Sequence, residues 1–154
     1  MALIKGARSF VLNLIKDLSL EEMNAIPGGF NNNLVWNLGH MIATQQNFCY
    51  RNSGLALVAE PSLLLKYAMG TKPESFVDSK ELKTLEGLLV STIDRFEEDM
   101  RKGLFKEYTP LNLKSYQDLP IQNIEDALQF VAFHDGLHLG YMLALKRTLP
   151  IAQP

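Results

Sequence analysis

The sequence predicts an all-α protein, a four-helix bundle in which two long links between helices allow crossovers. Apolar residues recur every three or four positions in four separate stretches, which is the period of an amphipathic helix. Clusters of proline, glycine and asparagine separate these stretches. The chain of 154 residues is 47% apolar and 21% charged, so it is expected to form one globular domain over residues 1–154.

The first helix is expected over about residues 2–19. Charged side chains interrupt its apolar positions, which is typical of an amphipathic helix and not of a signal peptide. The expected buried stripe is Leu3, Ala7, Phe10, Leu14 and Leu18, and the charged residues are Lys5, Arg8, Lys16 and Asp17.

The second helix is expected over about residues 33–52. It follows the breaker Pro27-Gly28-Gly29, and the asparagines of residues 31–33 offer an N-cap. Residues 52–54, Asn-Ser-Gly, are typical of a helix end. Its expected apolar stripe is Leu34, Leu38, Met41, Ile42 and Phe48.

A long link over residues 55–77 follows, and a short helix is possible within it near residues 62–67. Asp78 and Glu81 have the spacing of a capping box and open a third helix over about residues 79–102. The buried face of that helix is expected to be Leu82, Leu85, Leu89, Thr92, Ile93, Phe96 and Met100.

The second link, residues 103–120, is polar and contains two prolines. Residues 107–109 and 113–116 are weak candidates for a short hairpin. The fourth helix is expected over about residues 121–149. It is apolar nearly all round, which predicts a central buried element.

Charge and cysteine content exclude several classes of partner. The net charge of −2 argues against nucleic acid, because phosphate binding needs a basic surface. No uncharged stretch is long enough to span a membrane, and no polybasic run suggests an anionic lipid surface. The single cysteine, Cys49, allows no internal disulfide, which favours a cytoplasmic protein.

The three histidines carry the chemical signal. His134 and His138 lie one turn apart on an apolar stripe of the fourth helix, so both imidazoles can reach one metal ion. His40 lies midway along the second helix, where it can face them across the bundle. Two interpretations stay open from spacing alone, which are a three-histidine metal site and hydrogen-bonded core histidines. The stripe is Ala127, Val131, His134, His138, Tyr141 and Leu145.

Other chemistries fit less well. Residues 134–138 resemble the zincin pattern, but Asp135 replaces the glutamate base and no third ligand follows His138. Asp135 is therefore expected at a helix–helix edge or on the surface. A di-iron bundle needs Glu-x-x-His, which is absent, and Cys49 is expected to be a core thiol.

Three segments resemble one protein family. The segment from Pro27 to His40 resembles the second-helix entry of the DinB-like family of proposed metalloenzymes, where Trp-x-x-Gly-His carries the first metal histidine. Residues 134–141, His-Asp-Gly-Leu-His-Leu-Gly-Tyr, resemble its last-helix signature His-x-x-x-His-x-Gly. Residues 69–73, Met-Gly-Thr-Lys-Pro, resemble its Gly-Ser/Thr-x-Pro link.

The resemblance implies a DinB/YfiT-like bundle with a divalent metal, nickel or zinc, on His40, His134 and His138. Characterised relatives include S-transferases and a maleylpyruvate isomerase that use a low-molecular-weight thiol such as bacillithiol or mycothiol. Many members have no known reaction, and members are often homodimers. The family often has glutamate where this chain has Asp135, and no role is assigned to it.

An open coordination position on such a metal would support hydrolysis of a small-molecule substrate, or transfer of a thiol. Helical spacing places four side chains near the ligands, each of which also has an ordinary explanation as a packing, helix-bonded or solvent-facing residue. These candidates for the pocket or the ligand surroundings are Trp36, Thr44, Asn47 and Tyr141.

The alternative is a non-catalytic, dimeric bundle that binds a metal or a small molecule, with the metal as a staple. A structural site would close its fourth position with a protein ligand, for which only a carboxylate such as Asp17 or Glu21 is a candidate. A homodimer is expected because the second helix carries apolar side chains beyond one stripe, namely Val35, Trp36 and Tyr50.

Overall fold

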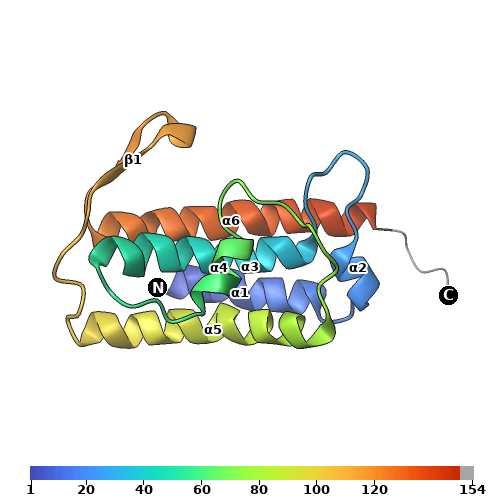
Figure 1. Cartoon of the computed structure of the whole chain (residues 1–154), viewed down its shortest axis with the longest axis horizontal. Coiled ribbons are helices and arrows are strands. Elements are labelled where there is room, and N and C mark those ends of the chain that lie inside the picture. Colours follow the sequence, from blue (N-terminus) through green and yellow to red (C-terminus); the bar gives the residue numbers. More distant parts are fainter. Residues whose placement is uncertain (150–154) are drawn as a thin grey trace.

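The computed structural model describes residues 1–149 and confirms an all-α bundle of four long helices (Figure 1). Two short helices and a two-stranded hairpin decorate the links between the long helices. The long helices are α1 (Ala2–Ile15), α3 (Leu34–Gln45), α5 (Ser79–Arg101) and α6 (Ile124–Thr148); the short ones are α2 (Leu20–Asn24) and α4 (Pro61–Lys66).

The long helices run in two parallel pairs (Figure 1). α1 and α6 run in the same direction, and α3 and α5 run in the opposite direction, so α3 and α6 are antiparallel. The link between α3 and α5 passes back along the bundle and carries α4 against α3. This crossover confirms that the connectivity is not a simple up-down-up-down chain.

The central element is α3, and not the last helix as the sequence pattern predicted. Every residue from Leu34 to Gln45 is buried, because α5, α6 and α4 all pack against α3. α6 is only partly covered, since Phe133 and Leu137 are 56% and 50% exposed. Within residues 1–149, no helix has both the length and the apolar character that crossing a bilayer requires.

α3 begins at an asparagine cap and continues past its nominal end. The Asn33 side chain accepts a hydrogen bond from the Trp36 amide at 2.8 Å. A π-helical turn, η1 (Gln46–Tyr50), and a 3₁₀ turn, η2 (Arg51–Ser53), extend the rod to Gly54, which has φ +67°. Only glycine adopts that backbone readily, so the predicted helix end at residues 52–54 is confirmed.

The buried stripe predicted for α1 is wrong. The buried residues are Ile4, Arg8, Val11 and Ile15, whereas Leu3 and Phe10 are 80% and 52% exposed. A charged residue within the true stripe made the neighbouring, uninterrupted apolar stripe look like the core face. The chain also turns earlier than predicted, since Ser19 and Glu22 form a capping box that opens α2.

Caps and turns define the remaining elements. Asp78 accepts from the Glu81 amide at 2.8 Å and opens α5, as its spacing predicts. The hairpin exists but uses other residues than expected, because β1 (Leu111–Leu113) pairs antiparallel with β2 (Leu119–Ile121). Asn123 then accepts from the Asp126 amide and opens α6.

One buried guanidinium joins all four long helices. Arg8 of α1, 1% exposed, donates to Asp135 of α6 at 2.8 Å. It also donates to the Leu89 carbonyl and the Thr92 hydroxyl of α5, and to the Met41 carbonyl of α3. Asp135 is therefore fully buried, and its predicted position at an edge or on the surface is wrong. Sequence periodicity cannot show a partner 127 positions away.

Breaking this pair on one side should destabilise the fold by about 3–5 kcal/mol, because the other charge stays buried without a partner. We expect that loss for Arg8→Met and for Asp135→Leu, measured as the free energy of unfolding in urea. The double variant should lose far less than the sum of the two.

The matched control is Lys102→Met, which breaks the exposed Lys102–Glu98 pair on α5. It should change the free energy of unfolding by less than about 0.5 kcal/mol. Strictly additive losses for Arg8 and Asp135 would contradict the coupling.

Candidate metal centre

The fold brings the three histidines together. His40 comes from α3, and His134 and His138 lie one turn apart on α6. Each ring offers one nitrogen, and these three nitrogen atoms all lie within 4.8 Å of one another. The ring centroids lie 5.1 Å apart for His40 and His134, 4.9 Å for His40 and His138, and 4.3 Å for His134 and His138.

Hydrogen bonds orient two of the rings. The Nδ1 atom of His40 lies 2.8 Å from the Tyr67 carbonyl oxygen, which can only accept, so Nδ1 carries the proton. The Nδ1 atom of His138 lies 2.7 Å from Oδ1 of Asn37, whose amide nitrogen donates to the Asn33 carbonyl. In both rings Nε2 is therefore the unprotonated nitrogen, free to bind a metal.

Burial keeps all three rings neutral. It lowers the pKa of His134 to about 2, with the neighbouring His138 adding to the effect, and lowers the pKa of His138 to about 4. It also lowers the pKa of His40, although the Tyr67 carbonyl opposes that shift. Metal binding requires neutral imidazole, so these rings need lose no proton near neutral pH.

The donor set fits a divalent metal of the zinc or nickel type. Imidazole nitrogen suits both ions, and a three-histidine set leaves a position open. Among the described residues, no carboxylate or thiol joins the cluster, so neither Asp17 nor Glu21 is part of it. Nδ1 of His134 is buried without a hydrogen-bond partner among the described residues, so this ring lacks an orienting contact of the kind that Tyr67 and Asn37 make with the other two.

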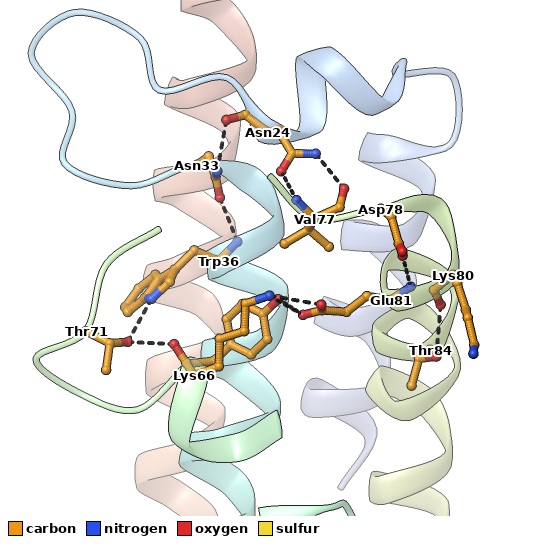
Figure 2. A network of polar contacts seen from close by, with 11 residues as sticks. Asn24, Asn33, Trp36, Lys66, Thr71, Val77, Asp78, Lys80, Glu81 and Thr84 are labelled. Atoms are coloured by element: carbon orange, nitrogen blue, oxygen red, sulfur yellow. Dashed lines mark hydrogen bonds and ion pairs between the residues drawn. The ribbon is translucent and has the colours of Figure 1, made fainter. Parts of the chain in front are cut away.

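Trp36 supports His40 from behind. The two rings stack with centroids 4.5 Å apart and planes inclined by 14°. The indole nitrogen donates to the Thr71 hydroxyl at 3.0 Å, and that hydroxyl lies 3.0 Å from the Lys66 carbonyl (Figure 2). The helix that carries the first ligand is thus tied to the crossover link.

Asparagines hold the same link at its far end (Figure 2). The Asn24 side chain exchanges two hydrogen bonds with the backbone of Val77, at 2.8 and 3.0 Å. The backbone carbonyl oxygen of Asn24 accepts from the Asn33 side chain, which also caps α3. These contacts fix where the link crosses α3, and therefore where the Tyr67 carbonyl meets His40.

Gly39 allows that meeting. A Cβ atom placed on Gly39 would lie 2.2 Å from Cγ of the Tyr67 ring, which is far inside van der Waals contact. The Tyr67 ring therefore packs directly on the α3 backbone, one residue before the ligand. This explains in physical terms why glycine precedes histidine in the segment Trp36-Asn37-Leu38-Gly39-His40.

A cavity of about 630 Å³ opens beside the three histidines. Thr44 and Asn47 line it, so these two candidates lie where helical spacing placed them. Trp36 lies behind His40 and does not line it, and Tyr141 packs edge-on against Phe30, with centroids 5.4 Å apart. The other lining residues are Phe48, Arg51, Asn52, Met69, Leu111, Leu113, Ser115, Tyr116 and Phe130.

Sequence reasoning missed the residues that orient the ligands. Asn37 lies inside the quoted motif and has a local signal, because it is a polar residue one turn before His40 on a helix that is otherwise apolar there. Tyr67 and Thr71 act through contacts 27 and 35 positions away from their partners. Arg51 lies eleven residues after His40, in the η2 turn that extends α3.

Cys49 takes no part in the cavity. It is fully buried, and burial raises the pKa of its thiol to about 12. It is therefore protonated at neutral pH and unable to act as a nucleophile without rearrangement.

The fold and the site define a class of protein, a four-helix bundle with three facing histidines at the floor of a cavity. The family model of the DinB superfamily matches residues 3–142, and the chain belongs to that family. No curated protein matches the chain.

Substituting Gly39 with alanine should damage the fold and the site together. We expect Gly39→Ala to lower the free energy of unfolding by about 1–3 kcal/mol, because the Tyr67 ring must move. The displaced carbonyl should weaken metal binding about 10- to 100-fold, measured by calorimetric titration with zinc.

Gly87→Ala is the matched control, since Gly87 lies on α5 with no atom within 4 Å of an added Cβ. It should raise the free energy of unfolding by about 0.5–1 kcal/mol. If Gly39→Ala behaved in the same way, the close-packing argument would be wrong.

Proposed function

We propose that this protein is a metal-dependent enzyme in which His40, His134 and His138 hold one divalent ion, nickel or zinc. One observation carries the proposal, namely that three imidazoles, two of them buried and one half-buried, converge beside a cavity open to a small molecule. A metal held there would keep a position open to a substrate, because no fourth ligand among residues 1–149 joins the histidines, and an open position is typical of a catalytic site.

When bound, the metal would supply Lewis acidity, which lowers the pKa of a coordinated water or thiol near neutral pH. The chain's own residues supply orientation. Tyr67 and Asn37 hold two ligand rings, and the Thr44 hydroxyl and Asn47 amide line the cavity and can position a co-substrate. The proposed reactions are transfer of a low-molecular-weight thiol to an electrophile, and hydrolysis.

The thiol reaction is consistent with a cytoplasmic location, because small thiols stay reduced there. The cavity walls include Phe48, Tyr116 and Phe130, so an apolar electrophile would be desolvated against them. The chain's one thiol does not compete with an added thiol, because Cys49 is buried and does not line the cavity.

The competing proposal is a metal- or small-molecule-binding bundle without catalysis. In that case the metal would act as a staple, and its removal would unfold the chain. The extensive core argues against a staple, because two apolar clusters hold the helices independently of the histidines.

Protein purified without an affinity tag or added metal should contain about one nickel or zinc ion per chain, measured by plasma mass spectrometry. His40→Ala and His134→Ala should each lose it while keeping their helix content, because two imidazoles bind more weakly than three. Cys49→Ala is the control and should keep the metal.

Full metal retention in His134→Ala would contradict the three-histidine site.

Loading the native protein with metal should accelerate either conjugation of a small thiol to an aromatic electrophile or hydrolysis of an ester. His134→Ala treated in the same way should show no acceleration. If chelation unfolded the chain and neither reaction were accelerated, the stapled bundle would replace the enzyme.

We also propose that the protein forms a homodimer, on a different basis from the one the sequence offered. Val35, Trp36 and Tyr50 are buried within the chain and are not available to a partner. Two side chains of the stripe predicted for α1, Leu3 and Phe10, are exposed on the outside of the bundle instead. A second copy of the same chain would cover that surface.

Sedimentation should give twice the 17.3 kDa chain mass for the native protein. Phe10→Glu should give the single-chain mass, because a carboxylate cannot be buried unpaired at the contact. Leu65→Glu, at an exposed leucine on α4, is the control and should leave the mass unchanged. A native single-chain mass would exclude the dimer.

A further inference from the structure

The cavity contains a positively charged side chain, that of Arg51, which has no role in the proposed metal chemistry. Arg51 of η2 lines it, and no aspartate or glutamate does. Among residues 1–149, the Arg51 guanidinium has neither an ion pair nor a side-chain hydrogen bond. Arg8 and Arg95, by contrast, each hold a carboxylate.

Arg51 and His40 line the same cavity from positions eleven residues apart along the chain. His40, Thr44, Asn47 and Arg51 follow one another along a single side of α3, η1 and η2. Eleven residues of helix span roughly 16 Å of axial rise, so the backbone positions of His40 and Arg51 are about three turns apart. The π-helical turn between them is a feature often found where side chains line a functional site.

Aromatic rings line the same cavity. Phe130 of α6 lies one turn before His134, with ring centroids 5.7 Å apart. Its ring also contacts Phe48 of η1 at 4.8 Å and Tyr116 at 5.4 Å. The hairpin brings Leu111 and Leu113 to the same cavity, and it rises from the end of the bundle where α6 begins (Figure 1).

We propose that the cavity binds an elongated organic anion, whose carboxylate or similar group pairs with Arg51 and whose apolar body lies against the ring cluster of Phe48, Tyr116 and Phe130. Guanidinium is the side chain best suited to a carboxylate, because its planar fork donates two parallel hydrogen bonds. The body of the ligand then points its other end at the histidines.

One further polar contact is available along the path. Oδ1 of Asn47 is buried at the cavity wall and accepts no hydrogen bond within the described residues. Rotation of the Asn47 side chain toward the cavity would let a hydroxyl or amide N–H in the middle of the ligand donate to it. The inference deepens the proposed function and rests on it only for the reaction, because anion binding at Arg51 needs no metal.

The test uses two probes that differ in charge and share a flat apolar body, naphthaleneacetate and naphthaleneacetamide. Full-length protein as purified should bind the acid about tenfold more tightly than the amide, measured by calorimetry. Arg51→Gln should abolish that preference, leave the affinity for the amide unchanged, and keep the metal content of the native protein.

Arg147→Gln is the matched control, since it removes one exposed positive charge at the far end of α6. It should keep the tenfold preference. Equal binding of acid and amide by the native protein, or an equal loss in Arg147→Gln, would overturn the proposal.

A chelator arm separates this inference from the metal centre. A preference that persisted in Arg51→Gln and disappeared on chelation would place the anion on the metal, and would overturn the role of Arg51. A native protein without metal would overturn the metalloenzyme and would still show the Arg51-dependent preference.

Discussion

The buried contact of Arg8 with Asp135 is the constraint on which the rest of the structure depends. Its guanidinium bonds to Asp135, which directly follows His134, and to the carbonyl of Met41, which directly follows His40. The same group therefore joins the four helices and fixes the separation of the two helices that carry ligands. Burial alone raises the pKa of Asp135 and Arg8 opposes it, so the charge on Asp135 depends on the pair.

The crossover link constrains the ligands from the other side. It supplies the Tyr67 carbonyl to His40 and the Thr71 hydroxyl to Trp36, and Asn24 secures its end. A ligand held only by its own helix could rotate about two side-chain bonds. The His40 ring is held by the packing of α3 and by the hydrogen bond of its Nδ1 to the link. It therefore has one orientation before a metal binds, which lowers the entropy cost of metal binding.

The sequence predicted what local rules determine. Periodicity located four long helices, cap residues such as Asp78 located their starts, and one-turn spacing paired His134 with His138. It failed where a contact joins distant residues. Arg8 interrupted an apolar stripe and so concealed the true core face of α1, and the exposed Leu3 stripe imitated one. Tyr67 lies in an irregular link, where no period marks which carbonyl faces a ligand.

The two walls of the cavity come from different parts of the fold. The residues proposed to bind the metal lie on one wall, and residues that shape the space for a ligand lie on the other. The histidines lie on α3 and α6, which the core and Arg8 hold rigidly. The opposite wall comes from the hairpin, including the 3₁₀ turn between its strands (Lys114–Tyr116), which contacts the bundle through Leu113, Ile121 and Tyr116. A change in the hairpin can alter the space offered to a ligand without moving a metal ligand, whereas a change in α3 alters both. Arg51 lies between these regions, at the end of the helical rod formed by α3, η1 and η2. Its positive charge can favour an anionic ligand over a neutral ligand of the same shape, which the two walls alone would not distinguish.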